Sequence, residues 1–217
     1  MRLLHRKPGV VSVFRLLRHA DHGRCVAKCF EDPRRLAYEH AVHLHARSIA
    51  PQGVVGVLGR DDDTLYLEDC ARGDLIESPP TRVAAALRGP AESLAALHAD
   101  GMAHGDVKPD NLFVRRDGDV VLGDFGASLV PGRAYPHRAC SSPSYRPPEH
   151  RRPTPAIDVY SLGRTIVVLR TRSMKTTPEH VRHRDPVLYD LLTQMLRRDP
   201  RDRLSMPDVL RHEWFTV

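Results

Sequence analysis

Residues 104–111 read His-Gly-Asp-Val-Lys-Pro-Asp-Asn, and thirteen residues after Asn111 the chain reads Asp124-Phe125-Gly126. Asp106 can accept the proton of an acceptor hydroxyl, and Lys108 can neutralise a transferring phosphoryl group. Asn111 and Asp124 offer oxygen ligands of the kind that Mg²⁺ prefers. The order and spacing of these residues predict phosphoryl transfer from a nucleoside triphosphate, whereas an isolated Asp-Phe-Gly would predict little.

Composition limits the class of protein. The 217 residues with 41% apolar content are enough for a globular core. The net charge of +6 is compatible with nucleic acid or membrane surfaces, but the arginines are spread along the chain without a block of like charge. Neither nucleic acid nor membrane is therefore an expected partner. The sequence does not indicate an oligomeric state.

Cysteine usage and hydropathy predict the location. The four cysteines are scattered without a Cys-x-x-Cys pair, which predicts neither a disulfide framework nor a zinc site. No apolar stretch approaches the roughly 20 residues of a membrane span. We therefore expect a soluble protein in a reducing compartment, cytoplasmic or nuclear.

The hydrophobic pattern changes along the chain from strands to helices. A hairpin is expected from 11–17 and 24–30, followed by a helix from Pro33 to about Arg47. Further strands are expected at 54–58 and 64–68, a helix at 81–98 that Gly89-Pro90 bends or interrupts, short strands within 106–125, and helices at 157–170 and 187–197. The first third is thus rich in strands and the remainder rich in helices.

Three further motifs carry a family resemblance. Residues 141–149 read Ser-Ser-Pro-Ser-Tyr-Arg-Pro-Pro-Glu, residues 158–163 read Asp-Val-Tyr-Ser-Leu-Gly, and residues 199–203 read Asp-Pro-Arg-Asp-Arg. With the motifs at 104–111 and 124–126, they make the chain resemble eukaryotic-type protein kinases of the serine/threonine type over nearly its whole length. The resemblance implies an α+β, two-lobed fold in one domain, 1–217. A small β-rich N-lobe with one helix would span about 1–69, and a mainly helical C-lobe about 70–217.

The resemblance also implies how ATP is held. Lys28 matches the strand lysine that contacts the α- and β-phosphates, and Glu39 is its expected partner, with Glu31 as an alternative. Leu67 would line the back of the adenine pocket. The backbone from Glu68 to Cys70 would contact adenine, and Asp74 would contact the ribose. The alternative is that Glu68 and Asp74 are ordinary acidic residues of the surface.

For the reaction itself, the resemblance implies Asp106 as catalytic base, Lys108 as the charge on the transferring group, and Mg²⁺ bound by Asn111 and Asp124. Ser142 would contact Asp106 and shape the site for the acceptor. Lys108 further points to serine or threonine hydroxyls of protein substrates. Glu149, Asp158 and Arg203 would be structural, Arg203 pairing with Glu149 and Asp158 holding the backbone of the 104–111 segment.

The chain also departs from the family pattern. Gly105 stands where most members have an Arg that reads a phosphorylated activation segment, so activity should depend less on that phosphorylation. Only Gly9 represents the glycine-rich loop, and either the start of the first strand is missing or the loop is minimal. The C-lobe is also trimmed. The minimal glycine-rich loop and the short C-lobe are similar to those of small viral kinases, and the arginine-rich composition fits a GC-rich genome.

Three alternatives stay open at this point. A pseudokinase or scaffold with weak nucleotide binding would explain the degenerate glycine loop. A small-molecule phosphotransferase shares His-Gly-Asp followed by Asn, although Lys108, Ser142, Arg203 and Pro147-Pro148-Glu149 favour a protein kinase. A nucleic-acid-binding module has only the net charge in its favour.

Overall fold

The N-terminal part of the molecule is an antiparallel sheet with the strand order β1-β2-β3-β5-β4. The computed structural model describes residues 2–7, 11–132, 142–149 and 154–216. The strands are β1 (Arg2–Lys7), β2 (Val11–His19), β3 (Gly23–Phe30), β4 (Val57–Arg60) and β5 (Thr64–Glu68). The predicted hairpin is formed by β2 and β3, and at its turn Gly23 takes a left-handed φ of 62° that favours glycine.

Two features of this sheet differ from the sequence prediction. The unpredicted strand β1 pairs with β2 as far as Lys7↔Val11, so residues 8–10 alone connect the two strands. A strand thus precedes Val11, while Gly9 lies outside the described residues. In addition, β4 begins at Val57 rather than at Val54, because Val54 pairs with Leu122 in the C-terminal part of the chain.

The helix α1 (Pro33–Ile49) packs against β3 and β5. Asp32 caps it by accepting a hydrogen bond from Arg34 N, and Pro33 occupies the first turn, where a missing amide hydrogen costs nothing. Its buried residues are Leu36, Glu39, Val42, His43 and Ala46. A carboxylate and an imidazole therefore face inward from an otherwise apolar stripe.

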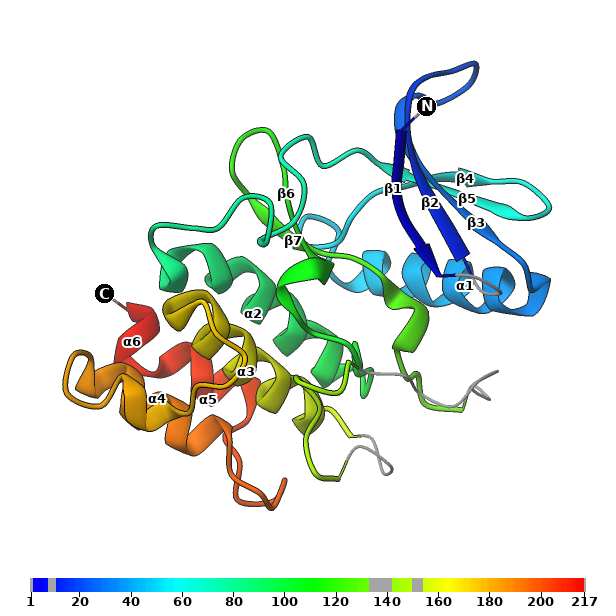
Figure 1. The fold of residues 1–217 in the computed structure, drawn as a ribbon. Coiled ribbons are helices and arrows are strands. Elements are labelled where there is room, and N and C mark those ends of the chain that lie inside the picture. Colours follow the sequence, from blue (N-terminus) through cyan, green and yellow to red (C-terminus); the bar gives the residue numbers. More distant parts are fainter. Residues whose placement is uncertain (1, 8–10, 133–141, 150–153, 217) are drawn as a thin grey trace.

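The remaining chain is mainly helical, and Figure 1 shows the five-stranded sheet and α1 on one side of the molecule and helices α2 to α6 on the other. The helices are α2 (Val83–Ala99), α3 (Ala156–Thr171), α4 (Pro186–Met195), α5 (Met206–Arg211) and α6 (Glu213–Thr216). A small sheet, β6 (Leu112–Val114) and β7 (Val120–Leu122), and three 3-10 turns, Pro109–Asn111, Phe125–Ala127 and Pro178–His180, complete this part. The predicted two-lobed α+β architecture is confirmed.

The sequence predicted that Gly89-Pro90 bends or interrupts the helix, and the interruption is wrong, because α2 runs through both residues. An internal proline removes one backbone hydrogen bond and costs about 3 kcal/mol. The apolar residues on both sides of it, Val83, Leu87, Leu94 and Leu97, are all buried. Each such side chain contributes about 1.5–3 kcal/mol, so burial of one continuous face outweighs the cost of Pro90.

No helix in the described part of the chain is both long and apolar enough to cross a lipid bilayer.

Candidate active site

Asp158, which is fully buried in the first turn of α3, holds the beginning of the segment 104–111 by hydrogen bonds. Its Oδ2 accepts a hydrogen bond from His104 N at 2.7 Å, and its Oδ1 accepts one from Gly105 N at 2.9 Å. His98 Nε2 lies 3.0 Å from the same Oδ2. The sequence prediction that Asp158 holds this backbone is confirmed.

Asp106, Lys108 and Ser142 form one hydrogen-bonded group. Asp106 Oδ1 accepts a hydrogen bond from Ser142 N at 2.8 Å, and its Oδ2 lies 2.9 Å from Lys108 Nζ. Lys108 Nζ also donates to Ser142 Oγ at 2.7 Å. Asn111 Nδ2 donates to the Asp106 carbonyl at 2.8 Å and to its Oδ2 at 3.1 Å. The structure thus brings four predicted site residues together around one carboxylate.

The backbone conformation and the packing at position 105 favour glycine, which the sequence analysis did not predict. The φ of Gly105 is 84°, and a Cβ added there would lie 2.3 Å from the Ala127 carbonyl oxygen. An arginine at this position would require both a strained backbone and a shift of Ala127. The departure from the family pattern is therefore built into the local packing. Residues 133–141, in the middle of the expected activation segment, lie outside the described residues.

Lys28 lies between two carboxylates. Its Nζ is 2.6 Å from Glu39 Oε1 on α1 and 2.8 Å from Asp124 Oδ1. Although burial by itself lowers the pKa of Lys28, the two carboxylates reverse the effect and raise it. Burial raises the pKa of Asp124, but the charge of Lys28 outweighs this and the net shift is downward. The predicted Lys28–Glu39 pair is confirmed, and the alternative Glu31 is not needed.

Three rings connect α1 to the 104–111 segment. Phe125 is fully buried, with its ring centroid 4.7 Å from that of His43 and 4.9 Å from that of His104. His43 Nε2 lies 2.9 Å from the Val55 carbonyl oxygen, and burial lowers its pKa to about 4. His43 was not predicted as a site residue, because a histidine on a helix carries no motif of its own.

The predicted adenine-binding segment begins at Glu68, the last residue of β5. Leu67 and Cys70 are buried in one apolar cluster with Val55 and Val121. The Glu68 carboxylate points to Arg115, with Oε1 2.7 Å from Nε, so only the backbone of Glu68 is available for the predicted role. This contact was not predicted.

Asp74, the predicted ribose contact, has one oxygen engaged in a turn. Its Oδ1 accepts hydrogen bonds from Ile76 N at 2.8 Å and Glu77 N at 2.9 Å. Burial is the main cause of a raised pKa of Asp74. The other oxygen, Oδ2, makes no hydrogen bond to the described residues.

The residues predicted to bind Mg²⁺ fit that ion by their donor atoms. Gly123 N donates to the Asn111 carbonyl at 3.0 Å, which brings the chain before Asp124 next to Asn111. Within the described residues, Asn111 uses its amide nitrogen on Asp106, and Asp124 uses Oδ1 on Lys28, so Asn111 Oδ1 and Asp124 Oδ2 remain available. The described residues contain no group of three or more His, Cys, Asp or Glu suited to a metal. Mg²⁺ commonly uses one or two carboxylates plus substrate phosphates, so a larger set is not required.

A buried ion pair holds the chain beyond the site. Arg203 Nη1 lies 2.6 Å from Glu149 Oε1 and 2.7 Å from the Ala156 carbonyl oxygen, and its Nη2 donates to the Arg197 carbonyl at 2.9 Å. The side chain of Arg203 is fully buried. The predicted Arg203–Glu149 pair is confirmed.

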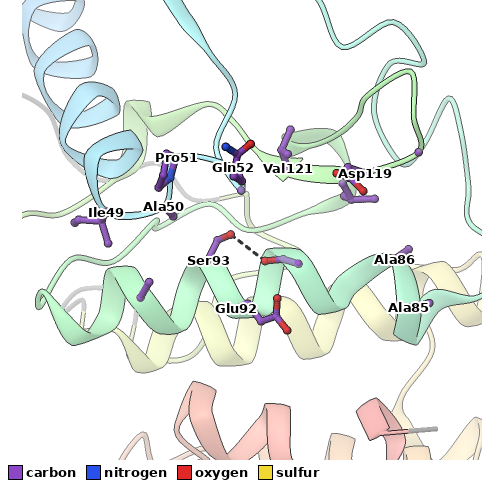
Figure 2. Close-up of a pocket in the computed structure, with 15 residues that line it drawn as sticks. Ile49, Ala50, Pro51, Gln52, Ala85, Ala86, Glu92, Ser93, Asp119 and Val121 are labelled. Atoms are coloured by element: carbon purple, nitrogen blue, oxygen red, sulfur yellow. Dashed lines mark hydrogen bonds between the residues drawn. The ribbon is translucent and has the colours of Figure 1, made fainter.

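One pocket lies away from these residues. Figure 2 shows this pocket of about 430 Å³ between the loop after α1, helix α2 and strand β7. Small residues such as Ala85, Ala86 and Gly53 line it, with Glu92 and Asp119 among its polar residues. None of the predicted site residues is among its lining residues, so its size is no argument for catalysis.

Comparison with known proteins places this geometry in a family. Residues 64–215 match the family model described as Protein kinase domain. The chain is 26% identical to CBL-interacting protein kinase 1 of Oryza sativa subsp. japonica over 227 aligned positions, which cover 90% of this chain and 49% of the rice protein. It is 30% identical to Serine/threonine-protein kinase PLK1 of Xenopus laevis over 201 positions, covering 78% of this chain and 34% of the frog protein. The chain therefore spans half or less of the length of these relatives.

Proposed function

The chain belongs to the protein kinase family, and from this premise we propose that it transfers the γ-phosphoryl group of ATP to serine or threonine hydroxyls of proteins. The observation that carries the proposal is the group formed by Asp106, Lys108 and Ser142, with Lys108 Nζ 2.9 Å from the Asp106 carboxylate and 2.7 Å from Ser142 Oγ. A carboxylate and an ammonium group side by side suit an acceptor hydroxyl and a transferring phosphoryl group.

Asp106 acts in this proposal mainly by orienting the acceptor hydroxyl. A carboxylate is a weak base, so it takes the proton late, as the bond to phosphorus forms. Lys108 stabilises the charge on the transferring group. Ser142, whose N–H holds Asp106 Oδ1 at 2.8 Å, keeps the carboxylate in place and shapes the acceptor site.

The nucleotide would be held by both lobes. Lys28 contacts the α- and β-phosphates, and Glu39 keeps it in position. Asn111 and Asp124 would hold Mg²⁺, which neutralises phosphate charge when bound. The backbone from Glu68 to Cys70 would bind adenine in front of Leu67, and Asp74 Oδ2 the ribose. Residues 1–217 would act as one kinase domain, with an N-lobe of about 1–69 and a C-lobe of about 70–217.

One observation favours a second function, a scaffold that binds nucleotide weakly. The pairing of Lys7 with Val11 leaves three residues, 8–10, for the loop that would cover the phosphates. Fewer backbone amides could then reach the phosphates than in a full glycine-rich loop. Against it, the residues expected for metal, base and phosphate contact are all present. A viral origin and a cytoplasmic or nuclear location stay predictions.

The test is a transfer assay with Mg²⁺, γ-labelled ATP and generic basic and acidic protein substrates, followed by identification of the labelled residue. We expect label on serine or threonine. Asp106→Asn should lower kcat by about 10² to 10⁴-fold while the Kd for ATP changes little, because the lost group acts on the acceptor. Nucleotide binding without transfer by the wild-type chain would favour the scaffold, and label on a small molecule alone would favour a small-molecule phosphotransferase.

A further inference from the structure

Arg115 makes the densest set of polar contacts near the predicted adenine-binding segment. It directly follows β6 and closes the β6–β7 hairpin, with its N–H donating to the Asp119 carbonyl at 2.9 Å. Its guanidinium forms a fork with Glu68, with Nε 2.7 Å from Oε1 and Nη2 3.0 Å from Oε2. Two parallel bonds to a charged acceptor fix orientation as well as distance. The C-lobe hairpin therefore holds the last residue of β5.

The same guanidinium reaches a third segment, the connection between α1 and β4. Arg115 Nη1 donates to the Gln52 carbonyl at 2.6 Å, and Nη2 lies 3.3 Å from the Val54 carbonyl oxygen. Glu68 reinforces this connection, since its Oε2 accepts a hydrogen bond from Gly56 N at 2.9 Å. One side chain thus links the C-lobe hairpin, the end of β5 and the loop that leads into β4.

The Arg115–Glu68 contact differs from an ordinary surface ion pair, because both side chains are largely buried. Only 16% of the Arg115 side chain and 30% of the Glu68 side chain are exposed. Burial raises the pKa of Glu68, but hydrogen bonds from Arg115 and Gly56 outweigh it and the net shift is downward. The next residue, Asp69, pairs with Arg24 on β3. Two consecutive acids after Leu67 are therefore held by arginines from opposite lobes.

We propose that Arg115 is a positioning residue that acts through Glu68 and sets the adenine-binding backbone, from Glu68 to Cys70, relative to the C-lobe. The inference rests on the proposed function, because it assumes that this backbone binds adenine. Arg115 touches neither phosphates nor acceptor in this proposal. Its loss should therefore weaken the binding of the purine and leave the chemical step nearly intact.

This role makes a prediction that a general loss of stability does not. Adenosine, ADP and ATP share the purine and differ in their phosphates. Replacement of Arg115 by Ala should raise the Kd of all three ligands by the same factor, about tenfold, the equivalent of one charge-assisted hydrogen bond. A substitution at the phosphate-binding end, such as Lys28→Ala, should instead raise the Kd of ATP more than that of adenosine.

The experiment measures these three dissociation constants by calorimetric titration, with KM for ATP and kcat where transfer is seen. For Arg115→Ala we expect KM to rise about tenfold and kcat to stay within about threefold. Arg115→Lys should be intermediate, because an ammonium group cannot form the fork. Arg116→Ala is the matched control, since Arg116 is exposed in the same hairpin and its loss removes the same charge.

A double-mutant cycle tests the route through Glu68. Glu68→Gln alone should weaken binding, and adding Arg115→Ala should weaken it little further, because both changes break one contact. Additive effects would overturn the route, and unchanged Kd values in both Arg115 variants would overturn the proposal. If Arg115→Ala does not fold, Arg115→Lys and Glu68→Gln still decide between these outcomes.

The outcome for the wild-type chain separates this inference from the proposed function. Binding of adenosine and ADP without any transfer would refute the proposed reaction, and the comparison of Arg115 variants would still be decisive. Failure to bind any of the three ligands would refute both.

Discussion

His43 makes the stability of this fold sensitive to mild acid. The ring is fully buried between α1 and Phe125, and its Nδ1 has no hydrogen-bond partner among the described residues. Because Nε2 faces the Val55 carbonyl oxygen at 2.9 Å, the neutral ring donates from Nε2. A second proton on Nδ1 would place an unpaired charge in the core. Burial accordingly lowers the pKa of His43 from 6.5 to about 4, with the nearby Lys28 and His104 contributing in the same direction.

The sign of the pH dependence follows from proton linkage. Between pH 6.5 and pH 4 the unfolded chain binds a proton at His43 that the folded chain does not, so the free energy of unfolding falls as the pH falls. The contribution is complete above pH 6.5. A shift from 6.5 to about 4 corresponds to about 3 kcal/mol. This is a large part of the roughly 5–15 kcal/mol typical of a domain.

The perturbation is His43→Gln, which keeps a donor for the Val55 carbonyl and removes the titrating ring. The assay is urea unfolding at intervals from pH 4 to pH 7 without nucleotide or metal. Between pH 6.5 and pH 4 the wild type should lose about 3 kcal/mol more than the variant. His183→Gln is the control, because His183 is exposed and solvent reaches its ring in the folded and the unfolded chain alike. Parallel curves for wild type and His43→Gln would refute the reasoning.

Three further predictions concern the site and its support. Asp124→Ala should abolish transfer while the apo protein keeps its melting temperature to within a few degrees, because Lys28 retains Glu39 at 2.6 Å; turnover within a few-fold of wild type would refute the metal assignment. Gly105 leaves no arginine to read a phosphate, so bacterially made protein should keep its activity after phosphatase treatment; a large loss restored by ATP would contradict this. Arg203→Met should lower the free energy of unfolding by about 3–5 kcal/mol in a urea titration, because it leaves Glu149 unpaired, and a loss below about 1 kcal/mol would count against that ion pair.

The fold was predictable where a long pattern repeats. The β2–β3 hairpin, α1, α3 and α4 each extend over enough residues for periodicity to show. Helix α6 has four residues and owes its burial to Trp214 and Phe215, so no periodic signal could indicate it. The wrong prediction at Pro90 has the opposite cause. A local rule indicated a bend or a break, and the packing of the whole helix prevented the break.

The candidate site was predictable where its residues are close in sequence or carry a motif. Asp106, Lys108 and Asn111 lie within six consecutive residues, and a carboxylate, an ammonium group and an amide at this spacing indicate phosphoryl transfer. The partner of Glu68 could not be predicted in this way. Arg115 is 47 residues away, and nothing in its sequence neighbourhood distinguishes it from the other arginines. Only the fold decides which of many possible cations meets a given carboxylate.

The arginines also have a structural role that the sequence does not indicate. Several arginines donate to backbone carbonyls in connecting segments or in terminal turns of helices: Arg47 to Val54, Arg88 to Phe215, Arg115 to Gln52, Arg164 to Met174 and Thr176, and Arg203 to Arg197 and Ala156. A buried carbonyl without a donor is costly, and connections between helices and strands contain many of them. A guanidinium has five N–H donors on a planar group and can satisfy two or three such carbonyls at once. The chain therefore uses several of its arginines as cross-links between segments that are far apart in the sequence.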